Sequence, residues 1–194
     1  MPSFYVLLGA LKRNNAHRLP DMLYHTERRI THHLEEGLQF HWNSEKLWAD
    51  LWLNWETFIQ PADTVQEQFV VGSSNEVVLP ANFRLMLKAL AAHRGGQMTK
   101  DTSRVQTLIN PLLGVTWQHA FLNDLHLTLA ARWVGFGDLS PKPELSYKSG
   151  YTVNLGANFA YKHFSYGLDY YRGQHVIAAR GNPILQSVSS AMPG

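Results

Sequence analysis

The stretch EKLWADLWLNWETF, residues 45–58, alternates between two kinds of side chain. One alternate set is wholly apolar and consists of Leu47, Ala49, Leu51, Leu53 and Trp55. The other set is mixed and consists of Trp48, Asp50, Trp52, Asn54 and Glu56. Because successive side chains of a strand point to opposite faces, this pattern predicts a β-strand with one apolar face and one wet face. A helix would instead place Leu47, Asp50 and Asn54 on one side.

The same period of two recurs along most of the chain. It is present in residues 34–43, 83–94, 105–118, 125–133, 152–162 and 164–170, and residues 5–13 and 67–78 are further strand candidates. Residues 83–94 also fit a helix, although a strand is the preferred interpretation. These segments predict an all-β fold with about 8–10 strands.

Short connections alternate with long ones. The tight turns are Asn43–Ser44, Phe121–Asp124 and Lys162–His163, and each separates two alternating segments. The long polar stretches are residues 14–32, 57–66, 95–103, 135–150 and 173–182. A β-sandwich has no reason to collect its short turns at one end, whereas an outer-membrane barrel has short turns on one side and long loops on the other. We therefore expect an antiparallel, up-and-down transmembrane β-barrel.

The composition excludes several classes of protein. The 194 residues are 45% apolar and 16% charged, whereas about 25% charged residues are usual in a soluble domain. The net charge of +2 is too small for a nucleic-acid surface, and the lack of cysteine excludes disulfides and thiolate sites. No uncharged apolar run approaches the roughly 18 residues of a membrane-spanning helix. We expect one domain over residues 1–194, with strands and loops to residue 186 and an unstructured tail at 187–194.

Aromatic residues on the apolar faces gather at the two ends of the expected strands. Those beside short turns are Trp42, Trp117 and Tyr161, and those beside long loops are Trp55, Trp133 and Tyr170. Amphipathic rings at both ends of an apolar band are typical of a surface that faces lipid. The six residues therefore predict two aromatic girdles.

Backbone pairing predicts that the barrel closes, because unpaired N–H and C=O groups do not persist in hydrocarbon. Three stretches, GLQFHWNSEKLWADLWLNWETF (37–58), NPLLGVTWQHAFLNDLHLTLAARWVGFGD (110–138) and GYTVNLGANFAYKHFSYGLDYYRG (150–173), resemble porin-like outer-membrane β-barrel proteins of Gram-negative bacteria. Such barrels usually end on an aromatic residue, whereas this chain ends on AMPG, which suggests an incomplete barrel. The resemblance implies the outer membrane as the location, and contact with the lipid bilayer and lipopolysaccharide.

Polar side chains on the other face are expected to line the barrel lumen. They are Asp50, Asn54, Glu56, Arg84, Lys88, His126, Arg132, Asn154, Asn158 and Asp169. A lining of mixed charge admits small hydrated solutes, although these charges could also simply pair with one another. Trp48 and Trp52 point the same way and could stack on a sugar ring or fill the lumen.

Enzyme chemistry finds little support in the sequence. Asp50 and Glu56 share a face, but six positions along a strand separate them by roughly 20 Å, too far for a glycosidase pair. A membrane-embedded acyl hydrolase would need a strand-borne serine beside a histidine, for which Ser165 and His126 are the conceivable pair. The adjacent histidines 32 and 33 lack the spacing of a metal motif. We therefore expect no enzyme, no metal and no cofactor.

A passive or weakly selective pore is the function that these patterns favour. One alternative is a soluble β-sandwich or lipocalin-like module that binds a small ligand with Trp48 and Trp52. Another is a filled barrel that only carries recognition loops.

Overall fold

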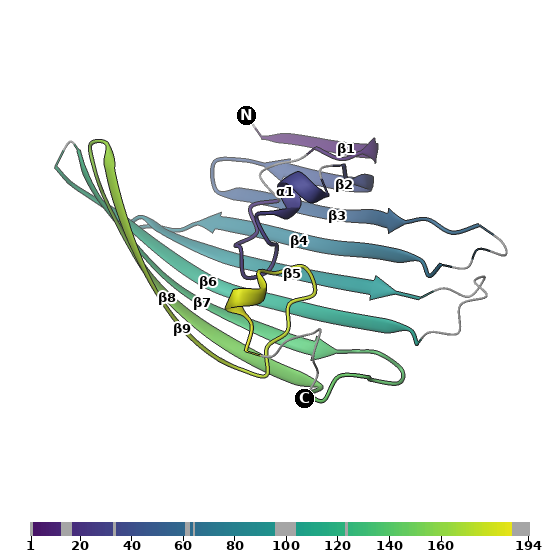
Figure 1. Ribbon diagram of the computed structural model, residues 1–194. Helices are drawn as coiled ribbons and strands as arrows, with labels where there is room; N and C mark the ends of the chain where they lie inside the picture. Colours follow the sequence, from purple (N-terminus) through teal and green to yellow (C-terminus); the bar gives the residue numbers. More distant parts are fainter. Residues whose placement is uncertain are drawn as a thin grey trace.

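A single antiparallel sheet makes up most of the protein. The computed structural model describes residues 2–12, 17–32, 34–60, 63, 65–95, 104–122 and 124–187. Each strand pairs with the next one along the chain, from β1 at one edge to β9 at the other (Figure 1). The strands are β1 (Ser3–Ala10), β2 (Glu36–Asn43), β3 (Leu47–Thr57), β4 (Gln68–Val78), β5 (Phe83–Arg94), β6 (Gln106–Leu122), β7 (Leu125–Asp138), β8 (Ser149–Tyr161) and β9 (Phe164–Gln174). The predicted all-β, antiparallel, up-and-down fold is confirmed, and no pairing within the described residues joins β9 to β1.

Helical structure is confined to two short pieces. These are the helix α1 (Arg28–Thr31) and the 3-10 helix η1 (Pro183–Leu185). Among the described residues, no helix has the length and apolar character needed to cross a membrane. Residues 83–94, for which the sequence also allowed a helix, form β5 and pair along their length with β4 and β6.

Short and long connections alternate, as the sequence predicted. Residues 44–46, 79–82, 123–124 and 162–163 are the short connections, and residues 11–35, 58–67, 95–105 and 139–148 are the long ones. Because consecutive strands run in opposite directions, all short connections lie at one end of the sheet and all long ones at the other. The sequence did not single out residues 79–82, because they lack the glycine that usually marks such a turn. Ala81 and Asn82 supply its two positive φ angles, 56° and 64°, instead.

The two faces of the sheet differ in what covers them. The connection 11–35 between β1 and β2, and the segment 175–187 after β9, lie over the same face (Figure 1). We call this the covered face and the opposite one the exposed face. Large apolar side chains of the exposed face, which include Leu51, Trp55, Leu87, Leu113, Leu129 and Leu155, are each between 39% and 50% exposed. The apolar alternate positions therefore point away from the protein.

Apolar packing holds the two covering segments on the sheet. Leu19, Met22 and Leu23 of the connection 11–35 belong to one cluster with buried side chains of the strands, which are Trp52, Val70, Met86, Leu90, Ala92, Leu112 and Val134. Ile177 of the segment 175–187 packs with Leu108 and Phe136 in a second cluster. The core of the protein thus lies between the covered face and these two segments. Of the expected tail, residues 187–194, Ser187 is held by hydrogen bonds with the backbone of Val176, and residues 188–194 lie outside the described residues.

Candidate active site

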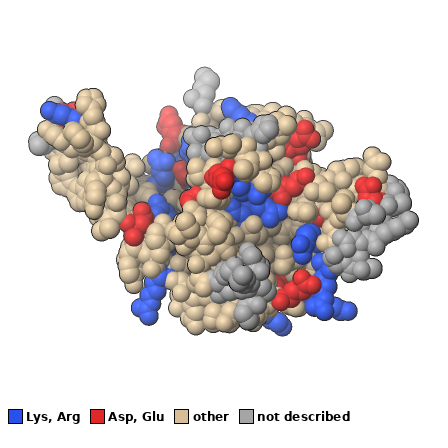
Figure 2. All heavy atoms as spheres, viewed as in Figure 1, with Lys and Arg blue, Asp and Glu red and all other residues tan. Residues whose placement is uncertain are grey.

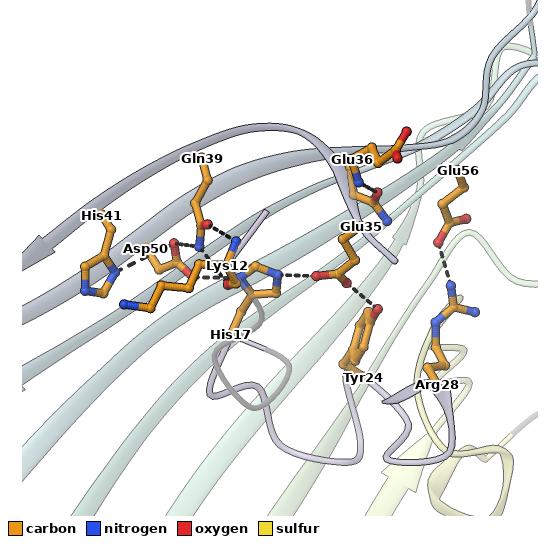
Figure 3. A network of polar contacts seen from close by, with 11 residues as sticks. Lys12, His17, Tyr24, Arg28, Glu35, Glu36, Gln39, His41, Asp50 and Glu56 are labelled. Carbon is orange, nitrogen blue, oxygen red and sulfur yellow. Dashed lines mark hydrogen bonds and ion pairs between the residues drawn. The ribbon is translucent and has the colours of Figure 1, made fainter. Parts of the chain in front are cut away.

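His17 is the centre of a buried polar network on the covered face (Figure 3). Its side chain has no exposed surface, and each ring nitrogen contacts a carboxylate. Nδ1 lies 2.6 Å from Oδ2 of Asp50, and Nε2 lies 2.8 Å from Oε2 of Glu35. Because carboxylates only accept hydrogen bonds, an imidazolium that donates from both nitrogens satisfies this arrangement.

Three parts of the chain bring these groups together. His17 comes from the connection 11–35, where it and Arg18 have positive φ angles of 58° and 55° and form a turn. Asp50 points inward from β3, and Glu35 immediately precedes β2. The sheet thus fixes both carboxylates, and the turn brings the imidazole between them.

Neighbouring side chains orient the two carboxylates. Gln39 of β2 donates its amide N–H to Oδ1 of Asp50 at 2.8 Å, and the backbone N–H of Lys12 donates to the Gln39 side chain at 3.0 Å. The hydroxyl of Tyr24 donates to Oε1 of Glu35 at 2.6 Å. Each carboxylate therefore accepts a second hydrogen bond besides the one from His17.

The surroundings favour the charged imidazolium. Burial lowers the pKa of His17, but the hydrogen bonds and charges of Asp50 and Glu35 outweigh it, so the pKa of His17 is raised above its ordinary value. Burial, together with the charge of Glu35, raises the pKa of Tyr24. Tyr24 therefore stays a neutral donor, and His17 keeps its proton to a higher pH than an ordinary histidine does.

The indole of Trp52 forms the floor beneath His17. The two rings are stacked with centroids 3.7 Å apart and planes 5° from parallel. Trp52 lies on β3 between Asp50 and Asn54 on the covered face, and its side chain is buried. The imidazole is thus held at its edge by carboxylates and on its face by an aromatic ring.

Two further ion-pair clusters tie the covering segments to the strands. Glu56 at the end of β3 accepts from Arg28 at 2.5 Å and pairs with Arg180 as well. Figure 2 shows acidic and basic side chains next to one another over the middle of the covered face. The second cluster lies around Glu76 of β4, which binds Lys88 at 2.8 Å, Arg84 at 3.1 Å and Arg18 at 3.3 Å. One carboxylate in each cluster therefore holds cations from distant parts of the chain.

A pocket of about 370 Å³ lies beside the network at the end with the long connections. Its lining residues are Thr31, His32, Leu34, Glu36, Asn54, Trp55 and Glu56. Trp55 lies on the exposed face and Leu34 is 68% exposed, whereas Asn54 points to the covered face and accepts from the backbone N–H of Glu36 at 3.0 Å. The pocket therefore joins the apolar surface to the polar interior next to Glu35.

The residues predicted to line a lumen are spread over the covered face. Asp50, Asn54, Lys88 and Asn154 are buried, Glu56, Arg84 and Arg132 are partly buried, and His126, Asn158 and Asp169 are exposed. Only Asp50 belongs to the His17 network, while Asn54 and Glu56 line the adjacent pocket. Many of the others pair, as the alternative interpretation expected: Arg132 donates to Asn154 at 2.6 Å, and Asn154 donates to Asp169 at 2.9 Å.

The predicted girdle residues lie on the exposed face. Trp42, Trp55, Trp133, Tyr161 and Tyr170 are each at least 39% exposed, and Trp117 is partly buried. Their contact with lipid stays a prediction.

The conceivable serine and histidine pair is not brought together. His126 stands opposite Ala160 on β8, and Ser165 stands opposite Ala160 on β9, so a whole strand separates them. Ser165 instead shares hydrogen bonds with the side chain of Asn158. Of the two adjacent histidines, His32 lines the pocket, and residue 33 lies outside the described residues.

Sequence reasoning missed His17, Glu35 and Tyr24 as a unit. His17 lies in a polar connection without periodic pattern, and its partners are 18 and 33 residues away. No local spacing rule covers such separations. The only signal in the sequence was the inward position of Asp50 on its strand, since a buried carboxylate needs a partner.

Comparison with known proteins gives one match. The family model described as lipid A 3'-O-deacylase-type matches residues 1–194. No curated protein and no solved structure matches. The resemblance to porins is therefore wrong, and so are the expected solute passage and the expected absence of catalysis, because the matching family is one of deacylases. The pattern misled because the alternation of side chains reports the antiparallel sheet architecture and carries no information about the reaction that a family with this architecture performs.

Proposed function

From the premise that this chain belongs to the lipid A 3'-O-deacylase-type family, we propose that it hydrolyses the acyl ester at the 3' oxygen of lipid A, with His17 as the acid–base group. The observation that carries this proposal is the buried imidazole between Asp50 and Glu35. A histidine oriented by a carboxylate is the usual proton acceptor in ester hydrolysis.

Nε2 is the nitrogen that would face the substrate. Asp50 at Nδ1 has no exposed side-chain surface and is fixed on β3. Glu35 at Nε2 is 5% exposed and lies next to Glu36, which lines the pocket. A water molecule or ester that enters from the pocket would take the place of the Glu35 carboxylate at Nε2, while Asp50 keeps the ring oriented.

The reaction then needs only water and one proton carrier. Among the described residues, no serine or threonine hydroxyl is hydrogen-bonded to His17, so water is the proposed nucleophile. Nε2 takes a proton as the water oxygen attacks the ester carbonyl, and Asp50 stabilises the imidazolium. When the intermediate collapses, the 3' oxygen of the sugar leaves and receives that proton, which yields a free fatty acid and a hydroxyl group.

The proposal extends to the location of the protein. Lipid A is the membrane-anchoring part of lipopolysaccharide, so the proposed location is the Gram-negative outer membrane. The apolar exposed face would contact the acyl chains of the bilayer, with the six predicted girdle residues at its borders. Trp55, which belongs both to the exposed face and to the pocket lining, would then lie where an acyl chain enters the pocket from the lipid side. The charged residues of the covered face would hold the covering segments in place.

The test is the loss of deacylation in His17→Gln. We expect the released fatty acid, measured by mass spectrometry with purified lipid A in detergent, to fall by a factor of about 100–10,000. His126→Gln is the matched control, because His126 is exposed and far from the network, and it should keep full activity. Retained activity in His17→Gln, with heat-modifiable gel migration unchanged in both variants, would refute the assignment.

The pH dependence gives a second test. Asp50 and Glu35 raise the pKa of His17, and Tyr24 contacts Glu35 as a neutral phenol. A proton acceptor must be uncharged, so activity should rise only above the ordinary histidine pKa of about 6.5. Glu35→Gln removes one negative charge, lowers the pKa of His17 and should move the acid limb of the profile to lower pH. A profile that moves the other way contradicts the proposed role.

A further inference from the structure

The stack of Trp52 on His17 depends on a gap in the neighbouring strand. Trp52 of β3 stands directly opposite Gly72 of β4. A Cβ atom at position 72 would overlap Cζ2, Cε2 and Cη2 of the Trp52 indole, far inside van der Waals contact. The indole therefore lies flat across Gly72, in space that any other residue would fill.

Neither backbone strain nor hydrogen bonding explains this pair. The φ angle of Gly72 lies outside the left-handed region, so the backbone there does not require glycine. The indole Nε1 of Trp52 is buried and has no hydrogen-bond partner among the described residues. Since a hydrogen bond does not fix the indole, its orientation depends on the gap beneath it and on the imidazole above it.

We propose that Gly72 and Trp52 are positioning residues, which together set the plane of the His17 imidazole for proton transfer. Asp50 and Glu35 fix the ring within its own plane, because they contact its two nitrogens. The indole fixes the remaining freedom, which is tilt out of that plane. The catalytic meaning of this device depends on the function proposed for His17, but the geometric claim does not.

Gly72→Ala is the decisive variant. The added methyl group should tilt or displace the indole, and the imidazole above it should follow. Because a misplacement of about 1 Å can cost about 100-fold in rate, we expect kcat to fall by about 10- to 100-fold. KM should stay within about twofold, since neither residue lines the pocket.

The direct readout is the NMR signal of the His17 ring protons in detergent micelles. A parallel stack at 3.7 Å puts these protons in the shielding region of the indole, so they should resonate upfield of the other histidines. His17→Gln identifies the signals by their loss. Gly72→Ala and Trp52→Leu should both move them toward ordinary histidine positions.

Two control variants on the covered face separate positioning from general damage. Trp48→Phe changes another buried tryptophan, whose ring contacts are with Arg18 and His41 rather than His17. Gly114→Ala adds a methyl group whose nearest neighbour is the flexible end of Met86 at 2.7 Å, followed by the Ala131 carbonyl oxygen and Cγ of Arg132, both at 3.3 Å. Neither variant should move the His17 signals.

A double variant tests whether Gly72 acts through Trp52. In a Trp52→Leu background the indole is gone, so Gly72→Ala should have no further effect on the His17 signals or on kcat. Additive effects in the double variant would overturn the proposal, as would unmoved His17 signals in Gly72→Ala. If His17→Gln keeps full activity while these signals behave as expected, the catalytic role fails and the positioning of the ring still stands.

Discussion

The covered and exposed faces of this sheet differ in the side chains that they bury and present. The covered face buries a charged network around His17, Asp50 and Glu35, whereas the exposed face presents leucine and tryptophan side chains to the surroundings. In water such a surface would be costly, because apolar side chains normally gain most from burial. The lipid contact proposed for the exposed face would account for this difference, and each prediction below compares two changes that it should affect differently.

The largest effect is expected from Asp50→Ala. This change leaves His17 buried with one carboxylate fewer, and breaking a buried ion pair typically costs about 3–5 kcal/mol. Leu51→Phe, one residue along β3 on the exposed face, keeps an apolar surface and should change the free energy of unfolding by less than about 0.5 kcal/mol. Urea unfolding in detergent micelles measures both. Equal costs at the two positions would mean that the faces do not differ.

The second largest loss of stability is expected from a charge placed on the exposed face. Leu129→Arg puts a guanidinium in the middle of the apolar band of β7, where lipid contact would make it cost about 2–4 kcal/mol. Thr128→Arg, on the covered face, lines a cavity of about 480 Å³ near the short connections and should be tolerated. The comparison uses urea unfolding after reconstitution into lipid vesicles. Tolerance of both arginines would show that the exposed face does not contact lipid.

A smaller difference in stability is expected between a partly buried ion pair and an exposed one. Arg180→Ala removes a partly buried partner of Glu56 and should cost about 1.5–3 kcal/mol, the range for hydrogen bonds to charged groups. Arg104→Ala removes an exposed partner of Glu144 at 3.7 Å, and such pairs contribute about 0–1 kcal/mol. The same unfolding assay checks both. A costlier Arg104 variant would contradict the assigned difference.

The smallest expected effect is the pH dependence of stability. The pKa of His17 is raised in the folded protein, so its contribution is complete below the unfolded pKa and is lost as pH rises through the folded pKa. The free energy of unfolding should therefore decline as the pH rises above the ordinary histidine pKa of about 6.5. His17→Gln should flatten that decline. If the free energy of unfolding increases over the same pH range, His17 is not the group whose protonation stabilises the folded protein.

The sequence predicted which side chains lie on each face of the sheet, but it did not predict that the segments 11–35 and 175–187 pack against one of these faces. Alternation at Leu47–Trp55 placed each side chain correctly, because a period of two is a local property of the strand. The connection 11–35 has no such period, and its seat on the sheet depends on Leu19, Met22 and Leu23 meeting side chains of five strands. Contacts between residues so far apart in the sequence produce no periodic pattern from which they could be predicted.

The candidate site shows the same limit. The position of Asp50 in the alternation correctly predicted that its side chain points inward. The partner expected for it was a hydrated solute, whereas the structure places a histidine there. The alternation also could not distinguish a filled interior from an open one, since both need polar side chains at the same positions. That distinction depends on the segments 11–35 and 175–187, which the sequence treated as loops.

His17, Glu35 and Asp50 come from three separate stretches of the chain. This origin determines the stage of folding at which the His17 network can form. The imidazole can contact both carboxylates only after β2 has paired with β3 and the connection 11–35 has packed against these strands. Contacts across such separations form late, because the intervening chain must first be ordered. A chain in which this sheet has not yet formed therefore lacks the assembled His17 network, and the acid–base role proposed for His17 would arise only once the fold is complete.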